Sequence, residues 1–141
     1  MKDVISIEIS SDKLNLQNCY DFVTDDSCGG IALFVGTVRN RTSEKNVKQL
    51  DFSTYKSMAI KELEKIAFYA MNNFLIKKIA IHHAEGQLDI GEIPVIIAVS
   101  SEHRKAAFKA CQYAIDTLKK NAPIWKKEYF DDGEVWVNAH P

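Results

Sequence analysis

The chain lacks the marks of several common protein classes. Its 141 residues contain three cysteines, Cys19, Cys28 and Cys111, an odd number, widely spaced and without a CxxC pair. This argues against a disulfide framework, and we expect buried or inert thiols in a reducing compartment. No apolar run approaches the ~20 residues that span a bilayer, and residues 1–4 contain no signal-peptide core. We therefore expect a cytoplasmic protein with no membrane attachment.

The chain also has no large excess of positive or negative charge, and it lacks the common ligand-binding motifs. The formal net charge is −1, so bulk charge does not indicate a nucleic-acid or membrane partner. There is no HExxH, no GxxxxGK[ST], no GxGxxG and no Gly-x-Ser-x-Gly. His82 and His83 are adjacent, so on a strand they face opposite sides, and we expect core or surface roles for them. Neither a metal site nor a bound cofactor is predicted.

What is present is an ordinary globular composition, 46% hydrophobic and 26% charged, and a length that suits one domain over residues 1–141. Hydrophobic periodicity predicts strands at 4–10, 31–35, 47–55, 76–83, 93–100, 127–130 and 135–138. It predicts a short helix capped by Ser11 or Asp12, a helix from Ser57, and a longer helix from about Ser101 to Lys120.

Two connections refine this pattern. Residues 40–46 read as a polar loop that could be mobile, and Asp-Gly at residues 132–133 predicts a C-terminal β-hairpin. Strands that follow one another without an intervening helix imply antiparallel pairing. The fold class is therefore α+β rather than doubly wound.

Basic residues gather in the C-terminal third. Between Ser101 and Glu128 only three acidic residues oppose seven basic ones, which are Arg104, Lys105, Lys109, Lys119, Lys120, Lys126 and Lys127. Arg39 and Arg41 add to this charge. A solvated helix face would also look like this, but concentrated positive charge on a nearly neutral protein favours an anionic small ligand or an acidic partner tail.

Two positions within this segment stand out. At Ser100–Arg104 a strand ends and a helix begins with serine as the expected cap, so free backbone N–H groups together with His103 and Arg104 can bind an anion. Lys119 and Lys126 each have a lysine neighbour, and Trp125 offers an apolar wall; such surroundings lower a lysine pKa and suit acid, base or nucleophilic chemistry. For each of the two positions, the alternative is that its residues are ordinary solvated surface residues that bind no ligand.

Arg104 and Lys119 are fifteen residues apart on one predicted helix, which separates them by roughly 22 Å. A small ligand cannot easily contact both ends within one chain. Either the two ends serve different ligands, or a symmetric dimer brings His103 and Arg104 of one protomer near Lys119 of the other. We favour the dimer.

Several motifs together resemble the large, catalytic subunits of molybdopterin synthase. They span about residues 29–138, in order, and are FVGTVR (34–39), YKSMA (55–59), HAEGQLDIGE (83–92), VSSEHR (99–104) with Ala107-Phe108, DTLK (116–119), PIWKKE (123–128) and Trp136. The resemblance implies an α/β-hammerhead fold with an antiparallel sheet. It also implies a homodimer core within a heterotetramer, in which each large subunit binds a small ubiquitin-like sulfur carrier.

The resemblance further implies a sulfurtransferase reaction. The carrier's thiocarboxylated C-terminus would enter a pocket and give its sulfur to cyclic pyranopterin monophosphate, and two transfers would form the dithiolene of molybdopterin. By the same resemblance, Lys119 and Lys126 are catalytic. Substrate-binding positions are Thr37, Val38, Arg39, His103, Arg104, Lys119, Lys126, Lys127 and Glu128. A cysteine carrier is rejected, because no cysteine has motif support for a lowered pKa.

Two departures from the family pattern stand in this chain. Many relatives carry arginine after the histidine of the central turn, where this chain has Ala84, and a basic residue near the C-terminus, where it has His140. Two other classes remain open: a non-enzymatic module that binds an acidic partner tail, and a stand-alone Schiff-base lysine enzyme.

Overall fold

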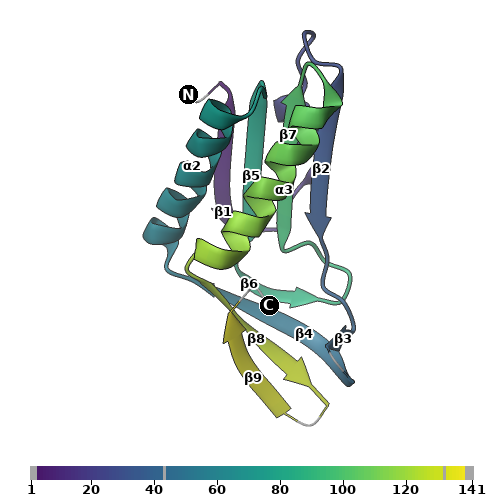
Figure 1. The fold of residues 1–141 in the computed structure, drawn as a ribbon. Helices are drawn as coiled ribbons and strands as arrows, with labels where there is room; N and C mark the ends of the chain where they lie inside the picture. The colour runs from purple at the N-terminus through teal and green to yellow at the C-terminus, as the bar shows by residue number, and fades with distance from the viewer. Residues whose placement is uncertain (1–2, 43, 132, 139–141) are drawn as a thin grey trace.

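The computed structural model describes residues 3–42, 44–131 and 133–138. A four-stranded sheet has the order β1 (Ile5–Ser10), β5 (Lys78–Ala84), β7 (Val95–Ser101) and β2 (Gly30–Gly36). β1 runs parallel to β5, whereas β5, β7 and β2 pair antiparallel. Helices α2 (Lys56–Asn73) and α3 (Arg104–Asn121) lie side by side across one face of this sheet (Figure 1).

The two central strands, β5 and β7, are buried on both faces because helices cover both faces. Along β7, Val95, Ile97 and Val99 belong to the core beneath α2 and α3. The alternate residues Ile96 and Ala98 pack instead with Cys19 and Val23 of α1 (Leu16–Val23) on the opposite face. An unbroken apolar run is the expected sequence of such a doubly covered strand.

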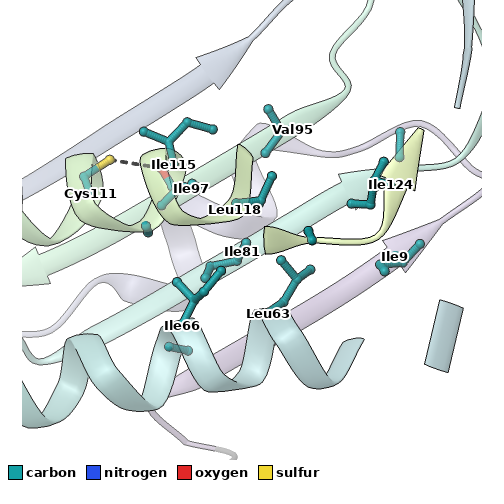
Figure 2. Packing of buried hydrophobic residues seen from close by; sticks show 14 of the residues in the cluster. Ile9, Leu63, Ile66, Ile81, Val95, Ile97, Cys111, Ile115, Leu118 and Ile124 are labelled. Atoms are coloured by element: carbon teal, nitrogen blue, oxygen red, sulfur yellow. Dashed lines mark hydrogen bonds between the residues drawn. The ribbon is translucent and has the colours of Figure 1, made fainter. Parts of the chain in front are cut away.

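The helices present their apolar stripes to this sheet. Figure 2 shows Leu63 and Ile66 of α2, and Ile115 and Leu118 of α3, all directed toward the strands. Complete burial of an aliphatic side chain such as Leu63 contributes roughly 1.5–3 kcal/mol to folding. This packing fixes the rotation of α3 and therefore the direction of the other residues on it.

A second sheet lies at one end of the first, beyond the C-terminal end of α3 (Figure 1). Its main path is β3 (Arg41–Thr42), β4 (Lys45–Thr54), β8 (Ile124–Phe130) and β9 (Gly133–Asn138), and β6 (Gly86–Asp89) pairs with β4. The long strand β4 buries Val47, Leu50 and Phe52 and changes register at a bulge between Val47 and Gln49. The bulge bends β4.

The predicted α+β class, the antiparallel pairing and the C-terminal hairpin are confirmed. On β4 the predicted faces are also confirmed, with Leu50 and Phe52 buried and Ser53 exposed. Within the described residues no helix is long and apolar enough to cross a membrane.

Several local predictions were wrong. α1 is capped by the Asn15 side chain, which accepts from the Asn18 amide, and not by Ser11 or Asp12. α3 has His103 at its N-cap without a side-chain cap, because the Ser101 hydroxyl instead donates to the His103 carbonyl. Residues 40–46 were expected to form one loop, but β3 and the start of β4 pair there as a short hairpin. Strand β6 was not predicted.

Candidate active site

A pocket of about 340 Å³ opens where the two sheets meet the C-terminal end of α3. Its apolar wall combines strand and helix residues, and its polar lining collects hydroxyl, imidazole, cationic and carboxylate groups. The apolar residues are Phe34, Gly36, Val47, Leu50, Phe52, Pro94, Val95, Ile115 and Leu118. The polar residues are Thr37, Arg39, Thr42, His83, Lys119, Lys126 and Glu128.

Gly36 sets the close approach of β2 and β7 at the pocket wall. A Cβ atom at this position would lie 2.7 Å from Cγ1 of Val95, a contact that real side chains do not tolerate. Glycine therefore lets β2 pair with β7 as far as Val95. Thr37 and Arg39 follow immediately and reach the pocket from the strand end.

Lys126 and Glu128 enter the pocket from β8. They are two residues apart and so share one face of the strand, where Lys126 Nζ lies 3.4 Å from Glu128 Oε1. Glu128 is only 4% exposed, which makes this pair the best-shielded ion pair of the pocket. The pair fixes the Lys126 side chain inside the pocket, because a buried carboxylate needs a partner.

Lys119 enters the same pocket from the last turn of α3, and its surroundings differ. Among the described residues no carboxylate pairs with it. Burial lowers the pKa of Lys119, and the nearby cations Lys126 and Arg39 lower it further. Lys119 therefore loses its proton more readily than an ordinary lysine side chain.

His83 forms part of the wall between these groups. It is 3% exposed, and its ring meets the Phe52 ring edge-on at a centroid distance of 5.3 Å. Burial lowers the pKa of His83 to about 4, and Lys119 contributes in the same direction. The predicted core role is correct, but its place in the pocket was missed.

His103 and Arg104 lie at the opposite end of α3 and are exposed. His103 borders a second hollow, formed with residues such as Phe74, Leu75 and Lys109, rather than the pocket that holds Lys119. Within one protomer the structure thus separates these two predicted anion ligands from the lysines. This is the arrangement expected from their spacing along a single helix.

Two further predicted site residues lie outside the pocket wall. Val38 is buried, and its backbone bonds to Glu92 and Gly91. Lys127 projects from the other face of β8, where its Nζ lies 2.8 Å from Glu134 Oε1 and above the Tyr129 ring. The pair raises the pKa of Lys127.

The cysteines do not contribute a reactive thiolate to the pocket. Burial raises the pKa of both Cys19 and Cys111 to about 11. Cys28 is partly exposed and lies at the loop before β2. Among the described residues no group of His, Cys, Asp and Glu side chains could hold a metal ion.

The two departures from the family pattern have different outcomes. Ala84 is buried, its carbonyl accepts from His83, and its amide donates to Pro94, so this position is part of the fold rather than of the pocket lining. His140 lies outside the described residues.

Comparison with known proteins gives concordant matches. The family model described as MoaE protein matches residues 9–121. The chain is 47% identical over 131 residues to the molybdopterin synthase catalytic subunit of Dictyostelium discoideum, covering 92% of this chain and 83% of that one. The crystal structure of molybdopterin synthase from Staphylococcus aureus superimposes with a TM-score of 0.87 at 35% identity, covering 97% and 98% of the two chains.

A further solved structure is a protein–protein complex of subunits 1 and 2 of molybdopterin-converting factor from Helicobacter pylori. It matches with a TM-score of 0.76 at 23% identity and covers 97% of this chain and 93% of that one. At this identity the likeness concerns the fold.

Proposed function

Because the chain belongs to the MoaE protein family, we propose that it acts as the catalytic subunit of a molybdopterin synthase and uses the α3–β8 pocket as its active site. The family resemblance first seen in the sequence motifs is confirmed. The chain is an enzyme of molybdenum cofactor biosynthesis, a sulfurtransferase, and residues 1–141 act as its single catalytic domain.

The observation that carries the site proposal is the gathering of three cations in one apolar-walled pocket. Arg39, Lys119 and Lys126 come from a loop, a helix end and a strand, yet they line the same cavity, and Glu128 is the one carboxylate among the described residues that line it. Such a pocket attracts anions and strengthens their binding by excluding water. A thiocarboxylate tail and a phosphorylated pterin are both anions.

The proposed chemistry assigns different roles to the two lysines. The carrier's sulfur attacks a carbon of the precursor and displaces the oxygen substituent of that carbon, which leaves with its bonding electrons. Water then adds to the acyl carbon, the acyl carbon–sulfur bond breaks with the sulfur departing as a thiolate on the pterin, and a carboxylate stays on the carrier. Negative charge develops on the acyl oxygen during this step. Lys126, positioned by Glu128, stabilises that charge. Lys119, with its lowered pKa, exchanges a proton with the water that adds, or attacks the acyl carbon in its place and forms an amide that water then hydrolyses.

Substrate phosphate would be bound by Arg39 and by the exposed pair His103 and Arg104. Since this pair lies at the far end of α3, we place it in the pocket of a second protomer in a homodimer. Thr37 and Glu128 line the pocket and complete its substrate-contacting set, whereas Val38 and Lys127, which lie outside the pocket wall, stay in the predicted set on the family resemblance alone. A small ubiquitin-like carrier on each protomer completes a heterotetramer, and the assembly works in the cytoplasm. The two-subunit complex from Helicobacter pylori is a precedent for the carrier.

Reconstitution tests the proposal directly. This chain, a thiocarboxylated carrier and cyclic pyranopterin monophosphate should yield the dithiolene product. Lys119→Ala should lower product formation by about 10²–10⁴-fold, because a proton-transfer or nucleophilic group is lost, while carrier binding stays intact. The matched control is Lys120→Ala, which removes the adjacent, exposed lysine and should leave the rate unchanged.

The competing classes predict other results. A module that only binds an acidic tail would not depend on Lys119, and the comparisons do not favour it. A stand-alone Schiff-base enzyme would be trapped on Lys119 by borohydride with a carbonyl substrate and without a carrier. Normal product formation by Lys119→Ala would disprove the catalytic assignment of this lysine.

A further inference from the structure

One edge of the first sheet ends in an apolar strand that no other strand covers. β2 is the last strand in the order β1-β5-β7-β2 and, within the described residues, pairs only with β7 (Figure 1). Its sequence, GIALFVG over residues 30–36, contains neither a charge nor a proline, and its register against β7 runs without a bulge. Natural edge strands normally carry at least one of these protections, because their free N–H and C=O groups invite another strand. We therefore expect β2 to be paired in the working assembly.

The opposite edge of the same sheet shows the contrast. β1 is protected by Glu8, whose side chain is 54% exposed near the middle of the strand. If two copies of β1 paired about a two-fold axis, their carboxylates would lie near one another and repel. Of the two edges of this sheet, β2 is the one that can pair with a copy of itself without such a cost.

Large apolar side chains flank the free edge of β2 on both faces of the sheet. Leu33, at the centre of the strand, is 42% exposed because α1 packs mainly on β5 and β7. On the other face, Phe108 of α3 is 64% exposed. Tyr113 stacks on Tyr69 of α2, and Phe108 lies about 140° away from Tyr113 around the helix, which turns it to the β2 side. The uncharged strand thus has an apolar border on each face.

The N-terminal end of α3 lies directly over the start of β2. A Cβ atom at Gly30 would be 3.3 Å from Cα of Arg104. The other end of β2 leads into the pocket, since Gly36 and Thr37 both line it. Arg104 and the pocket therefore lie at opposite ends of one strand. An antiparallel partner strand reverses these ends, so that Gly30 of one copy lies beside the partner's Gly36.

We infer that two copies of the chain pair through the free edges of β2, antiparallel about a two-fold axis near Leu33, so that their first sheets become continuous. A two-fold axis repeats every contact, so His103 and Arg104 of each copy come beside the partner's segment 37–39. Both pockets thereby gain exposed cations that lie apart from them within one protomer. The pairing names the surface of the homodimer, and its link to catalysis rests on the proposed function.

A charge at the centre of the strand tests this interface. Leu33→Glu changes a partly exposed side chain and places two carboxylates close to the axis. We expect the dissociation constant of the dimer, measured by sedimentation equilibrium on the full chain, to rise about a hundredfold or more. Leu75→Glu is the matched control, at a leucine that is 90% exposed beside the second hollow, and should leave the constant unchanged. Circular dichroism establishes that both variants are folded.

Crosslinking keeps the inference testable if Leu33→Glu does not fold. Facing residues of an antiparallel pair have Cβ atoms about 5 Å apart, so a short bismaleimide should join Leu33→Cys chains into covalent dimers. Cys28→Ser is included in every chain, because Cys28 is partly exposed and would also react. Leu75→Cys in the same background should stay a single chain on a denaturing gel.

The outcomes separate this inference from the proposed function. A folded Leu33→Glu chain that stays dimeric, or crosslinking through Leu75→Cys rather than Leu33→Cys, would overturn the pairing. An intact Leu33→Glu dimer that no longer binds the carrier would assign the edge to the carrier's tail and overturn it equally. Failure of Lys119→Ala to lower product formation would instead refute the proposed function, and neither sedimentation nor crosslinking depends on that result.

Discussion

The two ends of α3 carry similar basic residues in different surroundings. At the C-terminal end, Lys119 is partly buried in a pocket that also holds two other cations and a neutral imidazole. At the N-terminal end, His103 and Arg104 are exposed at the start of the helix. Burial and like charge lower the pKa of Lys119. Under the proposed function, the exposed residues at the other end of the helix would instead attract and orient an anion.

Mixed dimers give the largest expected effect, because they decide whether the two ends meet. A chain with Lys119→Ala and a chain with His103→Ala and Arg104→Ala should each be nearly inactive as homodimers. In a purified hybrid one of the two pockets regains every group, so about half of wild-type activity should return if each site is shared between protomers. An inactive hybrid, with both chains folded and paired, would show that the two ends serve separate ligands.

Acid sensitivity is the next largest effect and concerns His83. Its pKa is about 4 in the fold against 6.5 in the unfolded chain, so the unfolded chain binds more protons between these values. Stability is therefore full above pH 6.5 and falls as the pH drops toward 4, by roughly 2–3 kcal/mol at pH 4.5. The measurement is urea unfolding at several pH values.

Substitutions of single histidines identify which residue causes the loss of stability at acid pH. His83→Asn should show a shallower fall in unfolding free energy than the wild-type chain, although His82, whose pKa burial also lowers, still contributes. His103→Asn, at the exposed end of α3, should keep the wild-type dependence. If the unfolding free energy fell equally steeply with decreasing pH in all three proteins, burial of His83 would have no energetic consequence.

The smallest expected effect tests the partner of Lys126. Glu128→Gln keeps the size of the side chain and leaves a lysine that is 22% exposed without its carboxylate. Because that partial exposure lets water replace some of the lost interaction, we expect a loss of about 1–3 kcal/mol in unfolding free energy, less than for a fully buried pair. Glu134→Gln, which removes the exposed partner of Lys127, should change stability by less than about 0.5 kcal/mol.

Much of the fold could be predicted because it follows from simple periodicity. Leu63, Ile66 and Ala70 recur at helical spacing and do form the buried stripe of α2. The unbroken apolar run at 93–100 is the doubly covered strand β7. The distance between Arg104 and Lys119 could be predicted from the rise per residue of an α-helix alone. These features depend on neighbours in the sequence, which is why one sequence is enough to predict them.

The missed features depend on contacts distant in the chain. Strand β6 has only four residues, and it exists because it pairs with β4 between glycines that turn the backbone on either side. The capping of α3 was misjudged because the Ser101 hydroxyl bonds to a carbonyl and not to the free amides of the helix.

His83 in the pocket was missed for the same reason. A signal was available: a polar residue inside an otherwise apolar, buried strand requires a partner, and His83 had none in the sequence pattern. Only the arrangement of β4, β5 and α3 shows that it lines the same pocket as Lys119.

The order in which the pocket's parts leave the ribosome has a consequence for assembly. Its wall begins at Phe34 and is complete only with Glu128, so almost the whole chain must be synthesised before any cavity exists. β1 likewise waits for β5 before it can pair. Contacts so distant along the chain form slowly compared with those inside a helix. A nascent or truncated chain would therefore present its basic residues without a pocket, and no ligand could bind there until synthesis is nearly complete.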